Sequence, residues 1–509
     1  MREAVDRELE LVAGPGPALH RGAFHRGYGG SLDLEGYRAE AEAFLGKLDR
    51  EYYLHFSGRQ DEYGIEAIYE RHASLFSRES IDGLRARNAQ ALLEFAVHGL
   101  IGQETKAEAA ELARREAVLE VEVDGTRLPY RETSVVQANE ADPDRRAAID
   151  TTRNEALAKH LNPLLRELFD RGRALAAELG WPSTLAMCEE LSGIDLRQLA
   201  RQASALLEAT EESYEQLVAP ELDSQLGFGF ERLRRADLAA FFRATSFDRW
   251  FPEEGLIASL VETLAGLGID IESQPGVKLD TEPRAKKSPR AFCAPVQVPN
   301  EVYLVIARIG GRDDYAALFH EAGHTEHYAH MDPSLPVEDR YLGDNSVTEG
   351  FAFLIERLTE NPEWLGRVME VDDPEPIARH AAAVKLVFVR RYCAKLLYEL
   401  ELHDEHRSLA RLDRRYSELL GSAVHVDWPR VTWLADVDPF FYASRYLRAW
   451  ALEAQLKRTL DSRFGPAWFQ EPEAGELLRG LWSPGQRRDG DELLAELGGA
   501  RLDLSILTP

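Results

Sequence analysis

The helical spacing of apolar residues restricts the fold of this chain more than any other feature. In Leu196 to Leu217, leucines recur three or four positions apart with charged residues between them, and similar patterns fill most of the 509 residues. Such spacing places apolar side chains on one face of a helix. The sequence therefore predicts a mainly α protein.

Two segments favour β-structure instead. Val118 to Tyr130 alternates apolar and polar residues on both sides of Asp124-Gly125, which predicts a hairpin. Val296 to Ile309 is rich in β-branched residues and predicts a strand. We therefore expect a small β-sheet just before the segment that carries the chemical motifs.

The segment from Ser273 to Pro289 combines glycine, prolines and charges, which is typical of a loop. It suggests a division of the chain into two parts. We expect an N-terminal helical region over residues 1–285, with the hairpin near 118–130, and a second region over residues 286–509 that carries the catalytic residues.

Charge and composition exclude several classes of partner. The chain has 60 Lys and Arg against 88 Asp and Glu, a net charge of −28, so it repels nucleic acid and anionic membrane surfaces. It has no apolar run of about 18 residues, and its first residues are charged where a signal peptide would be apolar. Three widely spaced cysteines cannot form a disulfide framework. We expect a soluble cytoplasmic protein with no nucleic acid or membrane partner; the oligomeric state stays unknown.

The most specific motif is His320-Glu321-Ala322-Gly323-His324, within a segment that predicts a helix over Arg312 to Met331. Histidines four residues apart lie about 40° from each other on one helix face and about 6 Å apart along the axis, so both can bind one zinc ion. Glu321 lies beside them, where a carboxylate can take a proton from a zinc-bound water. The motif predicts a catalytic zinc site.

A catalytic zinc ion needs a third protein ligand, for which Glu349 is the preferred residue. It lies 25 residues after His324, in a second predicted helix, and the turn residues between the helices allow the chain to reverse direction. Ser346 to Glu349 also fits a capping box, in which Glu349 would bond only to the backbone. We predict one Zn²⁺ ion bound by His320, His324 and Glu349.

Three further residues near the motif have alternative interpretations. His330 has the spacing of a third ligand, but in a continuous helix it would lie about 9 Å beyond His324 and about 120° around the axis. His327 is interpreted as a core or supporting group. Glu356 could orient a ligand histidine or be a solvated helix residue.

At this point the sequence resembles the thimet oligopeptidase and oligoendopeptidase F family of zinc peptidases, and more distantly angiotensin-converting enzyme. The segments LFHEAGHTEH, TEGFAF and PFFYASRYLRAWALEAQL carry the resemblance, which extends from about Phe241 to Leu456. It implies a two-lobed helical ellipsoid around a deep substrate channel that admits short unfolded peptides. It also implies that the strand at Val302 to Ile309 is an edge strand that pairs with substrate.

The resemblance further implies that tyrosines near the C-terminus stabilise the oxyanion. Tyr446 is the preferred donor and Tyr442 the next, although aromatic residues four apart are also typical of core packing. Two departures from the family pattern affect this segment. Ser444 occupies the middle of the tyrosine-rich stretch, and residues 432–439 contain no histidine, so a second oxyanion donor is not identified.

The sequence thus predicts a zinc-dependent oligopeptidase in which Glu321 is the general base. A metallocarboxypeptidase of related helical fold is an alternative, for which Arg391, Arg445 or Arg448 could bind the substrate carboxylate. A non-catalytic zinc-containing binding protein is a second alternative. It is disfavoured because structural zinc sites usually fill all four positions, often with Cys, and no Cys lies near the motif.

Overall fold

Helical periodicity dominates the fold, as the sequence predicts. The computed structural model describes residues 32–404, 408–499 and 501–509, and within them the protein is mainly helical with two small sheets. The first part of the chain contains α2 (Leu34–Phe56), α3 (Ile65–Arg71), α4 (Arg78–Ala86), α5 (Gln90–Val118), α6 (Thr133–Asn139), α7 (Pro143–Ala156), α8 (Asn162–Glu178), α9 (Thr184–Ser192), α10 (Leu196–Ala209), α11 (Glu211–Leu226), α12 (Leu238–Arg243) and α13 (Leu256–Gly266). The second part contains α14 (Arg312–Ala329), α15 (Val337–Tyr341), α16 (Asn345–Glu356), α17 (Pro362–Arg367), α18 (Glu375–Leu402), α19 (Leu412–Val424), α20 (Tyr442–Phe464), α21 (Pro472–Trp482) and α22 (Gly490–Glu496).

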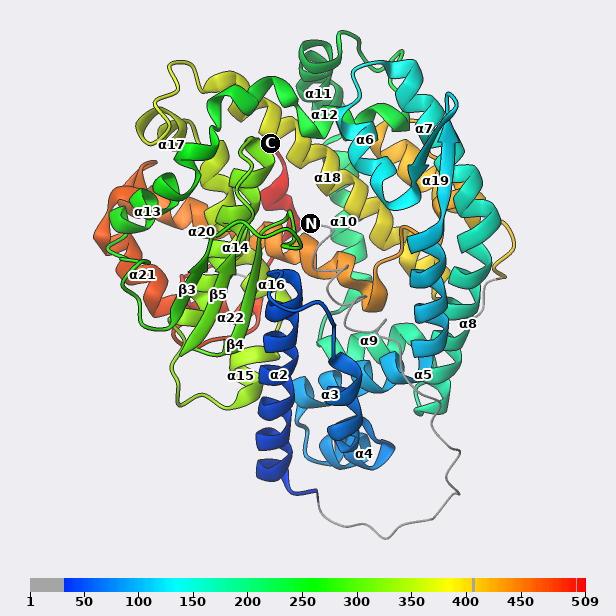
Figure 1. The fold of residues 1–509 in the computed structure, drawn as a ribbon, viewed down its shortest axis with the longest axis vertical. Helices are drawn as coiled ribbons and strands as arrows, with labels where there is room; N and C mark the ends of the chain where they lie inside the picture. Colours follow the sequence, from blue (N-terminus) through cyan, green and yellow to red (C-terminus); the bar gives the residue numbers. More distant parts are fainter. Residues whose placement is uncertain (1–31, 405–407, 500) are drawn as a thin grey trace.

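The expected hairpin is present as β1 (Glu120–Val123) and β2 (Thr126–Pro129), which pair antiparallel. Asp124 and Gly125 both have positive φ, 51° and 77°, as the tight two-residue hairpin turn requires. The hairpin lies at the end of α5, away from the motif helix α14 (Figure 1).

The second sheet differs from the sequence prediction. The segment expected as one strand forms β4 (Phe292–Gln297) and β5 (Glu301–Val305), which pair antiparallel, and β3 (Val277–Asp280) pairs parallel to β5 within the segment expected as a loop. The strand order is β3-β5-β4, so the implied edge strand is the central one and β4 is an edge. The short β3 depends on its pairing with β5, a tertiary contact that local sequence does not encode.

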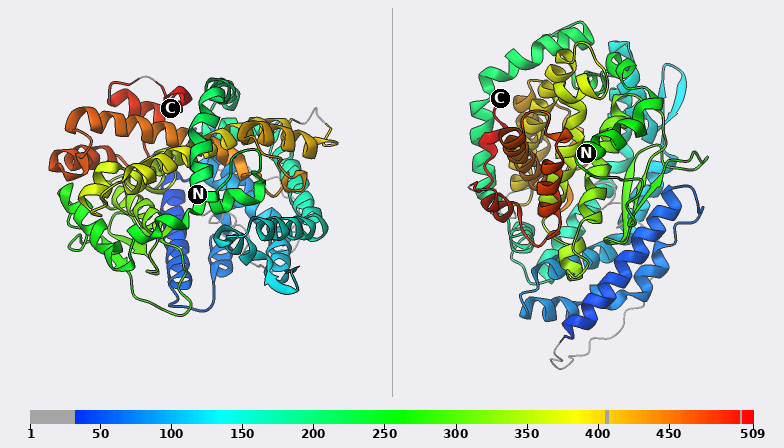
Figure 2. Two further views of the ribbon diagram at one scale, coloured as in Figure 1. Left: turned by 90° about the horizontal axis from the view of Figure 1, so that it is seen from above. Right: turned by 90° about the vertical axis from the view of Figure 1, so that its left-hand side faces the viewer.

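This sheet packs against α2 and leads into α14. Strand β4 contacts α2 on one side and α14 on another, and Figures 1 and 2 show α2 running beside the sheet. The boundary expected at residue 285 falls between β3 and β4, inside the sheet. The largest apolar core also combines residues from before and after this position, such as Leu92 and Leu264 with Tyr315 and Trp450.

Close helix packing around the motif depends on two glycines. A Cβ atom on Gly323 of α14 would lie 2.6 Å from the Cα of Ala352 in α16. A Cβ on Gly350 of α16 would lie 2.8 Å from the side chain of Leu452 in α20. The absence of side chains at these two positions lets α16 fit between α14 and α20.

None of the helices within the described ranges is both long and apolar enough to span a lipid bilayer.

Candidate metal centre

The predicted ligand residues lie on two packed helices, α14 and α16. Helix α14 begins after Gly311, where the side chain of Asp314 accepts hydrogen bonds from the backbone N–H groups of Ile309 and Gly310. Helix α16 begins after Asp344, whose side chain accepts from the N–H of Ser346. These caps fix the start of each helix and hence the direction in which its side chains point.

The potential ligand atoms of His320, His324 and Glu349 all lie within 4.8 Å of one another. The Nε2 atom of His320 lies 3.5 Å from Oε2 of Glu349. Two ligands about 2.1 Å from a tetrahedral zinc ion would be separated by roughly 3.4 Å. Glu349 is only 4% exposed, and within the described part of the chain its Oε2 atom has no hydrogen-bond partner, which leaves this oxygen able to bind a cation. The residues therefore fit a zinc ion.

The other ring nitrogen of each histidine has its own partner. The Nδ1 atom of His320 lies 2.8 Å from Oε2 of Glu356, and Nδ1 of His324 lies 2.9 Å from Oγ1 of Thr348. A donor hydrogen on each Nδ1 leaves the lone pair of Nε2 free to bind a metal. Both supporting residues come from α16, so this helix orients the two histidines and also carries Glu349, the third predicted ligand.

The charges of the ligand residues are strongly coupled. Burial lowers the pKa of His320, but contact with the carboxylates of Glu349 and Glu356 raises it more, to about 10. Burial raises the pKa of Glu349, but contact with His320 and the charge of His324 lower it to about 2. The carboxylates of Glu349 and Glu356 therefore favour a positive charge at His320, which is either a proton on its ring or a cation bound at Nε2 in place of that proton.

Glu321 points from α14 toward the edge strand of the sheet. Its Oε2 atom accepts a hydrogen bond of 2.7 Å from the backbone N–H of Cys293 in β4. The side chain is 8% exposed and lines the same cavity as the three ligand residues. A backbone donor thus holds the carboxylate of Glu321 beside the predicted ligand residues.

Tyr442 and Tyr446 lie on the first turns of α20 and both line the cavity. The hydroxyl of Tyr442 donates to Oε1 of Glu349 over 3.4 Å. Burial and the charge of Glu349 raise the pKa of Tyr446 well above its ordinary value, so its hydroxyl keeps its proton. Both tyrosines can therefore act as hydrogen-bond donors near the ligand set.

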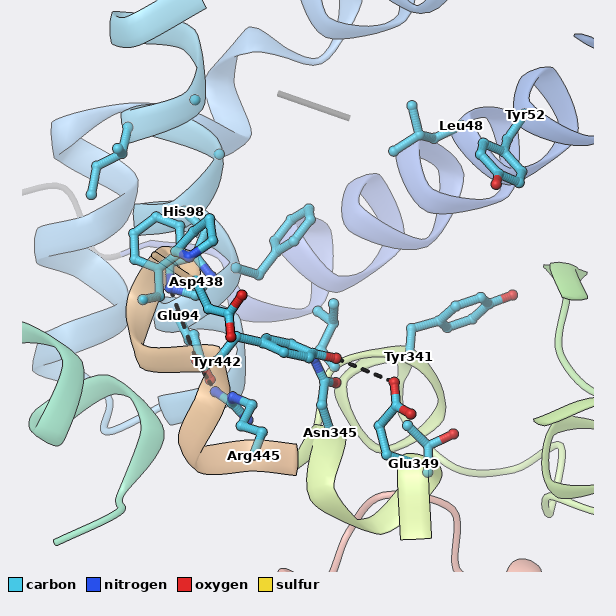
Figure 3. A pocket seen from close by; sticks show the side chains of 18 of the residues that line it. Leu48, Tyr52, Glu94, His98, Tyr341, Asn345, Glu349, Asp438, Tyr442 and Arg445 are labelled. Carbon is cyan, nitrogen blue, oxygen red and sulfur yellow. Dashed lines mark hydrogen bonds and ion pairs between the residues drawn. The ribbon is translucent and has the colours of Figure 1, made fainter. Parts of the chain in front are cut away.

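A cavity of about 680 Å³ joins the ligand residues to helices of the first part of the chain. Figure 3 shows Leu48 and Tyr52 of α2 apart from Glu349 of α16 and Tyr442 of α20, whereas His98 of α5 lies beside Asp438. Aromatic side chains form much of the wall in the first part of the chain, among them Phe44, Tyr52, Tyr69, Phe76, Phe95 and Phe169. The volume is within the range of small-ligand and peptide-binding cavities.

The other interpretations considered from the sequence concern the capping box at Ser346 and the histidines His330 and His327, and neither histidine belongs to the group of potential ligands in the structure. Helix α16 uses Asp344 as its N-cap, so the alternative capping box at Ser346 does not form and Glu349 lies one turn inside the helix. His330 ends α14, with Nδ1 2.9 Å from the carbonyl oxygen of Glu326. His327 is fully buried against Phe351, and burial lowers its pKa to about 3.

Sequence reasoning missed several supporting contacts. It assigned no role to Thr348, although this residue directly precedes the predicted ligand Glu349. It also missed the N–H of Cys293, because a backbone donor on a distant strand leaves no residue-type signal. Arg445 forms an ion pair with Glu94 of α5 across 351 residues, which only the folded chain reveals (Figure 3).

A scan against protein-family models finds no match to this chain, and a search of curated proteins finds none either.

Proposed function

We propose that this protein is a zinc-dependent oligopeptidase that hydrolyses peptide bonds in short unfolded peptides. The observation that carries the proposal is the convergence of His320, His324 and Glu349 at a cavity that also contains Glu321. These residues would hold a zinc ion through two imidazoles and a carboxylate, and three protein ligands with a neighbouring carboxylate are typical of hydrolytic zinc sites.

A zinc ion held by His320, His324 and Glu349 would supply Lewis-acid polarisation of a peptide carbonyl and a lower pKa for water. The chain's own residues supply the remaining chemistry. Glu321 takes a proton from the attacking water and transfers it to the leaving amine, while the Cys293 N–H holds its carboxylate in place. The hydroxyl of Tyr446 donates to the developing oxyanion, with Tyr442 as a second donor beside Glu349.

The cavity is proposed as the substrate channel between two lobes. Its wall includes Ala291, Phe292, Cys293 and Pro295 at the β4 edge of the sheet, so an extended peptide would lie along β4 rather than along β5. A cavity of about 680 Å³ has room for a short extended segment but not for a folded domain. Short unfolded peptides are therefore the proposed substrates.

The carboxypeptidase alternative receives no support from the arginines considered for it. Arg445 pairs with Glu94 and lies 3.6 Å from Asp344. Arg448 pairs with Asp344 at 3.2 Å, and Arg391 pairs with Asp436. Each cation is neutralised by an internal carboxylate. The second alternative, a non-catalytic zinc protein, does not explain why Glu321 lines a cavity beside the ligands.

Mass spectrometry of a mixed pool of blocked and unblocked peptides tests the proposal. We expect internal cleavage of short peptides, loss of cleavage with a chelator and recovery with Zn²⁺. Glu349→Ala should reduce the zinc content well below one ion per chain. Absence of cleavage across the pool by zinc-loaded protein would contradict the peptidase assignment, and release of single C-terminal residues alone would favour the carboxypeptidase.

A further inference from the structure

The cavity contains a cation that the described residues leave without a carboxylate partner. Arg173 of α8 lines the cavity, and its only described partner is the ring of Phe169, 5.7 Å from the guanidinium carbon. The other arginines of the wall differ: Arg445 pairs with Glu94, and Arg290 also has an interaction partner. An unpaired arginine in the cavity is unusual in a chain with a net charge of −28.

Other arginines of α8 near Arg173 form ion pairs with acidic side chains, as is usual for arginine. Arg166 pairs with Asp170 at 2.7 Å, and Arg171 pairs with Glu104 and Glu178. These three acids are outside the cavity wall. On α8, Arg166 and Arg171 therefore form ion pairs outside the cavity wall, whereas Arg173 lines the cavity without a described carboxylate partner.

The residue beside Arg173 is a buried histidine with an unsatisfied atom. His403, just after α18, lines the cavity, is only 9% exposed, and has an Nδ1 atom to which no described residue is hydrogen-bonded. Burial and the charge of Arg173 lower the pKa of His403 to about 3, so its ring is neutral. The positive charge here is therefore that of Arg173, and an unused polar atom lies next to it.

Direct contacts connect this position with the metal centre. The ring of His403 lies 4.9 Å from that of Phe441, and the next residue, Tyr442, donates to Glu349. Acids in the intervening wall are already paired: Glu94 with Arg445, and Asp438 with Lys395 at 2.8 Å. A substrate anion at Arg173 would therefore meet few uncompensated negative charges.

We propose that Arg173, with His403 beside it, binds a carboxylate of the peptide substrate in the cavity that also contains the predicted metal ligands. The proposal rests on the proposed peptidase function and adds a substrate class to it. The carboxylate comes from the free C-terminus of a peptide or from an acidic side chain, because both present two oxygens to the donor fork of a guanidinium. Arg173 thus sets specificity, with an anchored substrate chain extending toward Glu321.

Three matched fluorogenic peptides distinguish these sources: a free C-terminal acid, its C-terminal amide, and the amide with Glu as the last residue. For wild-type protein we expect kcat/KM for the acid to exceed that for the plain amide by about tenfold or more. In Arg173→Met, kcat/KM for the peptide acid should fall to the value for the plain amide, and kcat/KM for the plain amide should not change. Arg173→Lys should retain part of the preference, and Arg166→Met is the matched control that should retain all of it.

The amide ending in Glu identifies the source of the carboxylate. Cleavage at the rate of the free acid indicates that an acidic side chain suffices, whereas cleavage at the rate of the plain amide assigns the site to the C-terminus. Equal kcat/KM for all three peptides in wild-type protein, or an equal loss for all three in Arg173→Met, would overturn the inference while leaving the peptidase function intact.

Binding without turnover separates the two proposals. In a Glu321→Gln background, fluorescence anisotropy should show tighter binding of the acid than of the amide, and Arg173→Met should abolish the difference. This result would support the carboxylate site even if no peptide in the pool is cleaved. Equal binding of acid and amide would contradict it.

Discussion

Glu321 and Glu349 are both buried glutamates of the cavity, but their surroundings differ. Oε2 of Glu321 accepts a hydrogen bond from the N–H of Cys293, whereas Oε2 of Glu349 has no hydrogen-bond partner and lies 3.5 Å from His320. The first arrangement positions a carboxylate that exchanges protons, and the second leaves an oxygen for a cation. Two residues of one type thus acquire different proposed roles from their partners.

Substitution of the proposed base tests this distinction. Glu321→Gln keeps the size of the side chain and the acceptor for the Cys293 N–H, but the amide cannot take a proton from water. We expect zinc content and the urea unfolding midpoint close to those of the wild type, with kcat reduced by at least about a hundredfold. Retention of wild-type turnover would exclude Glu321 as the base.

At the scale of elements, the metal centre depends on how closely two helices approach. Gly323 lies in the motif itself, between the two histidines, and a Cβ there would come within 2.6 Å of the Cα of Ala352 and 3.0 Å of the carbonyl oxygen of Phe351. These are backbone atoms of α16, so a rotamer change cannot relieve the contact. The glycine allows the approach that brings Glu349 to the histidines of α14.

A methyl group at this position should therefore separate the helices. We expect Gly323→Ala to lower the free energy of unfolding by about 1–3 kcal/mol, as for overpacked cores, and to weaken zinc binding. Urea unfolding and zinc titration measure the two effects.

The matched control is Gly480→Ala in α21, where an added Cβ meets no atom within 4 Å. Alanine there should leave zinc binding unchanged and be neutral or stabilising, because it is a better helix former than glycine. If Gly323→Ala behaves like Gly480→Ala, the close approach of the helices is not what forms the site.

At the scale of the whole molecule, one buried carboxylate connects α2, β3 and the loop that follows it. Asp280 is 4% exposed and accepts from Tyr53 at 3.0 Å. It also pairs with Arg59 at 3.1 Å, with Lys287 at 3.0 Å and with Arg284. These contacts join α2 to the sheet that leads into the motif helix.

The stability of the molecule should depend on the charge of Asp280. Burial raises its pKa, but the hydrogen bonds from Arg284 and Lys287 lower it more, to about 2. A carboxyl whose pKa is lower in the folded state stabilises above its unfolded pKa of about 4, and this contribution is lost as the pH falls toward 2. Burial also lowers the pKa of Lys287 despite its contact with Asp280. Because a lysine titrates at alkaline pH, the prediction for Asp280 is restricted to acidic pH.

We expect Asp280→Asn to lower the free energy of unfolding by about 3–5 kcal/mol at pH 7, because it leaves the buried Lys287 without its carboxylate. The difference from the wild type should decrease between pH 4 and pH 2, where Asp280 itself becomes neutral. Urea unfolding midpoints across this range measure it. Asp82→Asn, at a position 79% exposed, is the control and should show no such trend; a difference for Asp280→Asn that stays constant with pH would contradict the assignment.

The sequence by itself determined the elements whose signal is local. Helical periodicity predicts the mainly α fold, the Asp124-Gly125 turn predicts the hairpin, and the spacing of His320 and His324 places two potential ligands on one helix face. These properties follow from the geometry of one helix or one turn, so neighbouring residues are sufficient to encode them.

Only the tertiary structure decided which distant residues meet. It chose Asp344 over Ser346 as the N-cap of α16, made β4 the sheet edge at the cavity, and placed Arg173 in the same cavity as the ligand residues. Each outcome depends on packing between segments far apart in the chain. Aspartate, serine and arginine are also common on solvent-exposed surfaces, so residue type alone does not predict these contacts. Close contacts such as that of Gly323 with Ala352 select one arrangement, because densely packed interiors tolerate few alternatives.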